Sequence, residues 1–238
     1  MIDHALISHL APTGALRAVI NLGNPVLAQG DPDHLQGVSV AIARRLAQWL
    51  GVALELVAVD AARAACLVIV DGRVDVCFLA IEPAREESIV FTAPYVVIEG
   101  VYVTDSDSPL ATSAEVDREG VRVGVREGSA YDLFLTRTLE HAEIVRAAEA
   151  TDVFEEQGLD AAAGVRQPLM ADVAETGRRI LEPAFMQINQ AVGLPRATSG
   201  QAVAQVAAFV EELKSSGFIR EELARSGVEA SVAPLVVS

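Results

Sequence analysis

Positive charge is scarce in this chain of 238 residues. Lysine occurs once, as Lys214 in the polar helix end Glu-Glu-Leu-Lys-Ser-Ser-Gly, so Schiff-base chemistry on a lysine is disfavoured. The 18 basic residues, almost all arginine, face 33 acidic ones, which gives a formal net charge of −15. A strongly acidic chain repels phosphate backbones, so we do not expect a nucleic acid partner.

Cysteine is equally rare. Cys66 and Cys77 each lie inside an apolar run, and no C-x-x-C or Cys/His spacing of a metal site is present. The sequence therefore predicts no metal and no cofactor. Two buried free thiols are the simplest expectation, with a disulfide between neighbouring elements as the alternative. Unpaired thiols favour a reducing compartment.

Long apolar runs are missing as well, and none approaches the ~18 residues of a membrane-spanning helix. The first ten residues contain neither the basic nor the apolar stretch of a signal peptide. The expected location is cytoplasmic as the sequence stands, or periplasmic or extracellular if a leader was removed. Apolar residues still make up 51% of the chain, enough for a substantial core in one large domain or two lobes.

Strand and helix patterns alternate along the first part of the chain. A short helix at 4–10 precedes a strand, helix, strand, helix and strand at 15–21, 38–50, 53–59, 62–70 and 74–80. This alternation predicts an α/β fold with a parallel sheet and right-handed crossovers.

A second module follows a β-rich run at 95–103. Its strands are expected at 121–125, 142–146 and 159–163, and its helices at 130–139, 149–157 and around 168–176. An extended piece at 185–190 and helices at 200–215 and 218–226 end the chain, with the last ten residues irregular. The sequence thus contains two βα modules in series and a helical tail.

Four segments carry a resemblance to a known family. They are Gly14-Ala-Leu-Arg-Ala-Val-Ile, the stretch from Gln36-Gly37 to Leu50-Gly51, the stretch from Asp71-Gly72 through Arg85 to Val-Phe-Thr-Ala-Pro-Tyr95, and Gly120-Val-Arg-Val-Gly-Val-Arg-Glu-Gly-Ser129. In this order and spacing they resemble the family 3 solute-binding proteins of ABC transporters, the polar amino acid binding type, over residues 12–227.

The resemblance implies a two-lobed type II periplasmic-binding-protein fold, each lobe a mostly parallel sheet flanked by helices. Lobe 1 would comprise residues 1–100 and 187–238, and lobe 2 residues 101–186. Hinge strands near 99–104 and 185–188 would join the lobes, and a small carboxylate-bearing ligand would bind in the cleft between them. A monomer, with an ABC permease as partner, is the expected assembly.

In this family an arginine after the third strand forks onto the ligand carboxylate, and Arg85 occupies that position. A guanidinium offers a planar double donor that matches a carboxylate. Ala80 and Glu82 belong to the same loop, which looks about two residues shorter than usual for the family. A surface arginine on a short helix is the alternative for Arg85.

A second anion-binding element is implied at Gly128-Ser129, where a helix begins. Backbone N–H groups at a helix N-terminus and a serine hydroxyl favour a carboxylate, although Ser129 can also be a plain N-cap. Tyr131 lies two residues into this helix and is a candidate for the cleft lining. Tyr95, from the family's Pro-Tyr pair, is expected to pack in the core.

Asn21 and Asn24 lie where the first strand ends, at positions that often hold an aspartate and an aromatic residue in the family. Two amides indicate hydrogen bonds to neutral polar groups, or turn formation around Gly23.

The sequence departs from the family after Asp160-Ala161. The aspartate that holds the ligand's amino group is replaced by Val165, followed by Arg166 and Gln167. A buried ammonium without an anion is costly, so an ordinary α-amino acid is a poorer fit. Either Glu82 replaces the missing carboxylate, or Arg166 or Gln167 reaches the cleft and the ligand has no amine. Arg166 can also be a solvated residue at a helix start.

An enzyme is not expected. The chain lacks a P-loop, G-x-S-x-G, H-E-x-x-H and a G-x-G-x-x-G after a strand. None of its four histidines falls on a predicted cleft segment. One branch of the family became cyclohexadienyl dehydratases, and Glu82 is the one carboxylate that suits such a role. A sensor or carrier protein without a transporter is the third reading.

Overall fold

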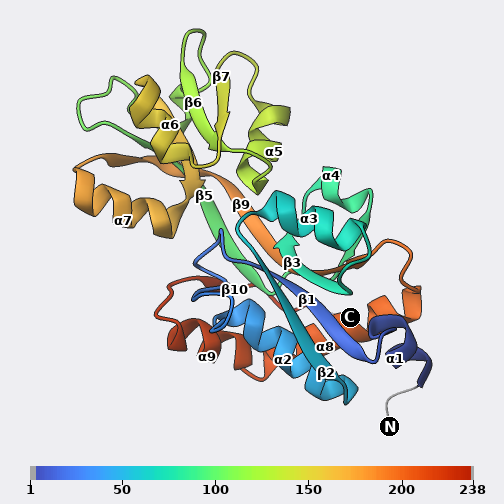
Figure 1. Cartoon of the computed structure of the whole chain (residues 1–238). Coiled ribbons are helices and arrows are strands. Elements are labelled where there is room, and N and C mark those ends of the chain that lie inside the picture. Colours follow the sequence, from blue (N-terminus) through green and yellow to red (C-terminus); the bar gives the residue numbers. More distant parts are fainter. Residues whose placement is uncertain (1–3, 237–238) are drawn as a thin grey trace. The chain divides into compact units, whose positions relative to one another are not determined.

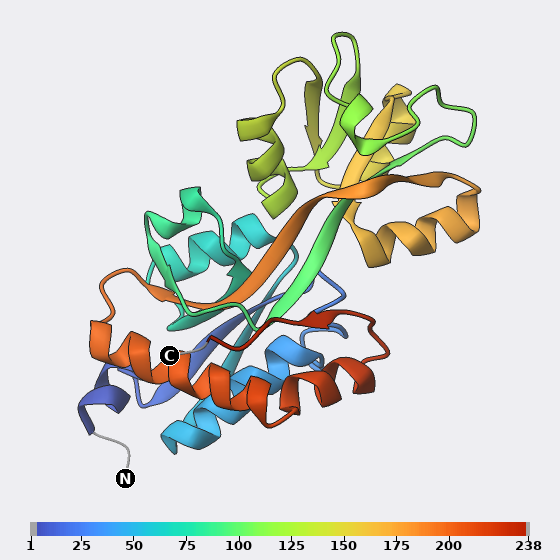
Figure 2. The ribbon, with the colours of Figure 1, turned by 180° about the vertical axis from the view of Figure 1, so that it is seen from behind.

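The computed structural model describes residues 4–236, with side chains from Leu6 onward, and divides the chain into two compact units. Unit 1 comprises the residues up to Val97 and from Asn189 onward, and unit 2 comprises Ile98–Ile188. Strands β5 (Val96–Thr104) and β9 (Arg179–Pro195) each run from one unit into the other. They are neighbours in the sheet and lie side by side in both views (Figures 1 and 2).

Unit 1 is built on three parallel strands. β1 (Ala15–Asn21) pairs along its whole length with β2 (Ala53–Val59), and it also pairs in parallel with β3 (Val76–Ala80). The predicted parallel sheet is therefore confirmed. The late part of β9 and the short strand β4 (Ile89–Phe91) continue the sheet in antiparallel orientation.

Helices cover both faces of this sheet. Consecutive residues of β1 and all residues of β3 are therefore buried, whichever face their side chains point to. α2 (Val38–Leu50) packs on β1 and β2, and α3 (Ala62–Val70) packs on β1 and β3. The remaining helices of this unit are α1 (His4–Leu10), α4 (Pro83–Glu86), α8 (Gly200–Ser215) and α9 (Phe218–Arg225).

The ranges predicted for α2, β2 and α3 match the structure to the residue. The reason is local for α2, where Ile42, Leu46 and Leu50 recur at helical spacing and are buried. Gly51 then adopts a left-handed conformation, with φ of 71°, and its N–H bonds back to the last turn.

Unit 2 repeats the pattern. β6 (Arg122–Arg126) pairs in parallel with β7 (Glu143–Ala147) and β8 (Ala161–Val165), and β5 pairs antiparallel with β8. Its helices are η1 (Ser113–Glu115), α5 (Ala130–Thr138), α6 (Ala150–Gln157) and α7 (Arg166–Thr176). A core that includes Phe154, Leu159 and Leu169 lies between α6, α7 and the sheet.

β8 begins two residues later than predicted because Asp160 belongs to the turn before it. The Asp160 carboxylate accepts a hydrogen bond from the Arg122 N–H at 2.8 Å, and its carbonyl accepts one from Thr104 Oγ1 at 2.7 Å. These contacts come from residues distant in sequence, so the local pattern does not reveal them.

The last ten residues are predicted to be irregular, which is wrong in one respect for those up to Val236; residues 237 and 238 lie outside the described part of the chain. Ser231–Val232 forms strand β10, which pairs with Val96 and Val97 of β5, and the Ala233 N–H bonds to the Tyr95 carbonyl. Lys214 lies in the last turn of α8, at the helix end where it was predicted, but it is buried. Its side chain is 1% exposed, pairs with Glu211 and donates to the Pro234 carbonyl at 2.8 Å. The described part of the tail is thus held by residues of β5 and α8, which the pattern of the tail itself does not reveal.

β9 is also much longer than the extended piece expected at 185–190. Pro183 weakens the strand pattern in the sequence, since proline cannot donate to a ladder. Pairing with β3, β4 and β5 extends the strand in both directions.

Candidate functional site

Several predicted residues of unit 1 gather at one edge of its sheet. Asn21 ends β1 and Ala80 ends β3, and parallel strands bring their carboxyl ends to the same edge. Open α/β sheets bind ligands at that edge. The chain leaves β3 through Glu82, the N-cap of α4, and reaches Arg85 within one helical turn.

Arg85 is folded back onto the strand that precedes it. Its Nη1 donates to the Ala80 carbonyl at 3.0 Å, and its backbone N–H donates to the Glu82 carbonyl at 2.8 Å. Only 4% of Arg85 and 3% of Glu82 is exposed. The short β3–α4 loop thus holds a cation and a carboxylate close to the strand end, rather than on the surface.

The electrostatics of this corner are those of a buried cation. Burial lowers the pKa of the Arg85 guanidinium, and this effect outweighs the opposing attraction of the Glu82 carboxylate. Burial raises the pKa of both thiols, so they remain neutral near pH 7. Both cysteines are free, with Cys77 buried and Cys66 partly so.

Asn21 and Asn24 form the turn after β1. Asn21 Oδ1 accepts the Gly23 N–H at 3.0 Å, and Asn24 Oδ1 accepts the Val26 N–H at 3.3 Å. These contacts correspond to the turn-forming alternative, and they fix both amides at the same sheet edge as Ala80.

In unit 2, Ser129 caps α5, and its Oγ accepts the Asp132 N–H at 3.0 Å. The preceding Gly128 has φ of +70°, a conformation that favours glycine. Its N–H donates to Asp132 Oδ2 at 2.8 Å. The chain's own carboxylate therefore already occupies one donor of the predicted anion site.

Asp132 was not identified from the sequence. It is buried, and its Oδ1 also accepts a hydrogen bond from Arg146 Nε at 3.0 Å. The Ser-x-x-Asp spacing from Ser129 was the available signal, because an acidic residue at the third helical position commonly completes an N-terminal cap.

The two tyrosines singled out above are both buried. Tyr131 is 9% exposed, and burial raises its pKa to about 12 against the opposing hydrogen bond with Ser129. Its hydroxyl is thus a neutral hydrogen-bonding group beside the α5 N-terminus. Tyr95 is fully buried, with its hydroxyl 3.1 Å from Ser39 Oγ, so the predicted packing role is confirmed.

Arg166 follows Val165 directly and opens α7, where it contacts two carboxylates of the same unit. Its Nη1 and Nη2 donate to the two oxygens of Glu182 at 2.7 and 2.9 Å, and its Nε donates to Glu99. The hydrogen bond to Glu182 is the main cause of a raised Arg166 pKa. Gln167, the next residue, has a buried amide oxygen.

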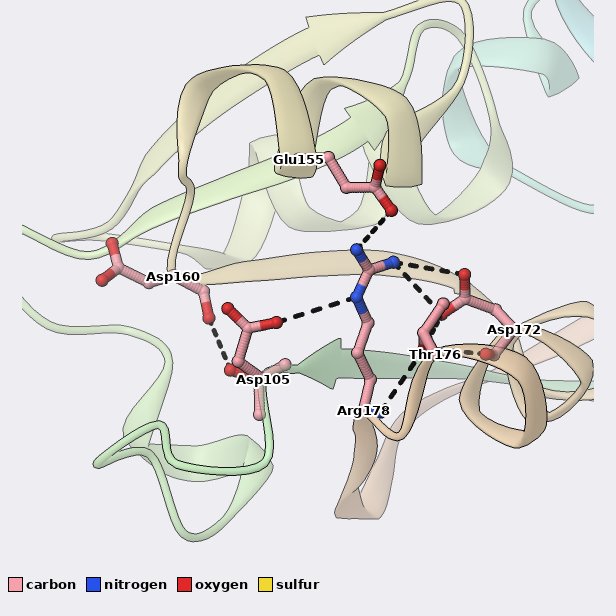
Figure 3. A network of polar contacts seen from close by, with 7 residues as sticks. Asp105, Glu155, Asp160, Asp172, Thr176 and Arg178 are labelled. Atoms are coloured by element: carbon pink, nitrogen blue, oxygen red, sulfur yellow. Dashed lines mark hydrogen bonds and ion pairs between the residues drawn. The ribbon is translucent and has the colours of Figure 1, made fainter.

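A third arginine of unit 2 is equally engaged. Figure 3 shows Arg178 between the carboxylates of Glu155, Asp172 and Asp105, and its guanidinium also lies 4.8 Å from the Phe154 ring centroid. This network joins α6, α7 and the start of β9, which is a fold-stabilising role. Among residues 4–236 no group of three His, Cys, Asp or Glu side chains could hold a metal ion.

A family model for bacterial extracellular solute-binding proteins, family 3, matches residues 17–225. The chain belongs to this family. No helix within the described part of this solute-binding protein is long and apolar enough to cross a membrane.

Solved structures show the same fold at low sequence identity. An amino acid ABC transporter substrate-binding protein from Streptococcus pneumoniae, bound to L-arginine, is 15% identical with a TM-score of 0.76, covering 96% of this chain and 99% of its own. A histidine kinase sensor domain similar to periplasmic binding proteins is 17% identical with a TM-score of 0.77, covering 92% and 98%.

The ancestral amino acid-binding protein AncCDT-1, a precursor of cyclohexadienyl dehydratase, is 18% identical with a TM-score of 0.74, covering 94% and 99%. The fold is therefore the two-lobed, type II periplasmic-binding-protein-like fold.

Proposed function

We propose that this protein binds an amino acid or a related organic acid by its carboxylate, in a cleft between its lobes, and passes it to an ABC permease. The observation that carries the proposal is the buried Arg85 at the carboxyl edge of the unit 1 sheet, where burial outweighs the attraction of nearby groups. A guanidinium in that setting gains most from a carboxylate.

Other residues of unit 1 have supporting roles. The loop residues Ala80 and Glu82 set the direction of Arg85, and Asn21 and Asn24 line the same edge with amides. Asn24 is not aromatic and cannot stack on a ligand, so we expect ligand recognition at this position to rely on hydrogen bonds.

Unit 2 contributes the N-terminus of α5. Because Asp132 accepts the Gly128 N–H, the ligand carboxylate is assigned to the Ser129 hydroxyl and the helix dipole, with Gly128 shaping the turn. Tyr131 supplies a neutral hydroxyl beside Ser129. Arg166 and Gln167 are weaker candidates for this site, since Arg166 already binds Glu99 and Glu182.

The amino group of the ligand has no aspartate at position 165. Glu82 is the nearest replacement, because it lies buried in the loop that carries Arg85. One protein of the same fold is solved with L-arginine bound. Because Glu82 can pair with an ammonium group but position 165 carries no aspartate, we expect both amino acids and their deaminated counterparts among the ligands.

A thermal-shift screen of amino acids and matched 2-oxo acids, followed by calorimetric titration, tests the proposal. Carboxylates should raise the melting temperature of the wild type and of Arg73→Lys, an exposed arginine of the same unit. Arg85→Lys should lose the shift. Binding by zwitterionic amino acids alone, unaffected by Glu82→Gln, would refute the role of Glu82. Equal affinity in Arg85→Lys would refute the clamp.

A dehydratase-like reaction is the second candidate, favoured by the likeness to a precursor of cyclohexadienyl dehydratase. Glu82 would then donate its proton to the ring hydroxyl of a cyclohexadienyl acid, which leaves as water while the ring carboxylate leaves as CO2, and Arg85 would hold the substrate's other carboxylate. The appearance of an aromatic product by ultraviolet absorbance, abolished by Glu82→Gln, would establish it. The likeness to a histidine kinase sensor domain bears on the partner protein and not on the ligand site, because a sensor and a transport protein would bind the ligand in the same way.

A further inference from the structure

The chain passes between its two units twice, and both passages lie within strands. Unit 2 is the continuous segment Ile98–Ile188, so the connections fall inside β5 and β9. Any opening or closing of the lobes must therefore twist or bend these two strands. Contacts that hold β5 and β9 in unit 2 therefore limit the opening and closing of the lobes.

Within unit 2, Arg166 is bonded to both strands. Glu99 lies on β5 two positions after Val97, and Glu182 lies on β9 six positions before Ile188, the last residue of unit 2. The guanidinium holds Glu182 by a two-pronged bond and Glu99 by its Nε, while its own backbone starts α7. One side chain thus joins three elements of unit 2.

The arginine is the most buried member of this ion-pair group. The Arg166 side chain is 22% exposed, whereas Glu99 and Glu182 are 44% and 61% exposed, and the planar fork on Glu182 is geometrically specific. The bond to Arg166 also lowers the pKa of Glu182, which agrees with a pair that is formed in the folded state. A fixed, forked contact is suited to holding strands in register.

The strands themselves are in close contact beside these ion pairs. A Cβ built on Gly100 of β5 would lie 2.6 Å from Met186 Cγ and 3.1 Å from Phe185 Cζ, both on β9. The rings of Tyr102 and Phe185 are 4.3 Å apart. β5 and β9 therefore touch within unit 2, and Arg166 ties this contact to α7.

We propose that Arg166 is a hinge brace: it fastens the two crossing strands to each other and to α7, and so limits how far they twist during lobe closure. The effect on ligand binding rests on the proposed function, whereas the effect on the strands does not. With the brace intact, fewer open conformations compete with the closed one, so closure costs less conformational entropy. Arg166 is then a positioning residue rather than a ligand contact.

Hydrogen-exchange mass spectrometry on the ligand-free protein tests the brace directly. Arg166→Met keeps the apolar stem and removes the fork, and Glu182→Gln keeps the shape of the partner. The matched control is Arg118→Met, which removes an exposed arginine–glutamate pair elsewhere in unit 2. Residues 98–104 and 179–188 should exchange faster in both brace variants and not in the control.

The ligand readout follows from the same variants. Dissociation of a bound amino acid or 2-oxo acid should be about fivefold faster in Arg166→Met, without a change in ligand preference. Unchanged exchange in the crossing strands would overturn the brace, as would faster exchange spread evenly through β6 and β7. Loss of binding with unchanged strand exchange would make Arg166 a ligand residue. If the wild type binds no carboxylate, the proposed function fails, and the exchange data still decide the brace.

Discussion

Two junctions, one in each unit, place an arginine just after a buried parallel strand. In unit 1, β3 leads into α4 and Arg85, and in unit 2, β8 leads into α7 and Arg166. Arg85 is buried, and desolvation lowers its pKa. Arg166 is more exposed, and its hydrogen bonds to Glu182 and Glu99 are among the causes of a raised pKa.

The difference lies in what surrounds each charge. A buried guanidinium at a strand end can form a forked pair with a ligand carboxylate, whereas one that already binds two carboxylates has little to gain. The same residue type at the same step of a βα unit therefore suits a ligand clamp in unit 1 and a brace in unit 2.

The largest expected difference is in ligand affinity. Arg85→Lys should weaken carboxylate binding about 100-fold or more, because the planar double donor is lost at a buried site. Arg166→Lys should change affinity by less than about tenfold. Isothermal titration with the same ligand measures both. Similar losses at the two positions would erase the distinction between clamp and brace.

Glycines next to the two junctions give a stability comparison. A Cβ on Gly193 would lie 2.6 Å from Cys77 Sγ and 2.7 Å from Ile89 Cγ2, both in the unit 1 core. Gly193→Ala should lower the free energy of unfolding by about 1–3 kcal/mol through overpacking.

Gly100→Ala should cost less, because its shortest clash is with the flexible Met186 side chain. Urea denaturation of both variants provides the measurement. A larger loss for Gly100→Ala would mean that the crossing strands in unit 2 are packed more rigidly than the unit 1 core.

Helix caps in the two units separate stability from binding. Ser129 caps α5 and Ser199 caps α8 by the same kind of bond, at 3.0 and 3.3 Å. Each serine-to-alanine change should cost about 1 kcal/mol of stability. Only Ser129→Ala should also weaken ligand binding, as titration of both variants would show. Equal affinities in the two variants would remove Ser129 from the site.

The smallest effect concerns acid. The bond from Arg166 lowers the pKa of Glu182 from its ordinary 4.5, so its stabilising contribution is present above that value and is lost as pH falls below it. The pair is partly exposed, so the contribution is at most about 1 kcal/mol. Urea titrations from pH 7 to pH 3 should show a shallower acid loss in Arg166→Met. Parallel curves would mean that the pair contributes nothing measurable.

The local sequence pattern was sufficient to predict elements that are held in place by packing of apolar side chains. The helical spacing in α2 and the continuous apolar run of β3 each predict one element, and both agree with the structure apart from the start of β3. Pattern failed for β10 and for most of β9, whose hydrogen bonds go to strands far away in sequence. The motif positions of Arg85, Ser129 and Asn21 were visible in the sequence, but their contacts were not.

The sequence by itself determined the α/β alternation, the family and the residue types available for a carboxylate ligand, because periodicity and motif order are properties of the chain. Only the tertiary structure decided which arginine is buried and which is braced. Desolvation and ion pairing depend on groups that approach through folding: Glu99 and Glu182 are 67 and 16 residues from Arg166 in the chain, yet bind the same guanidinium.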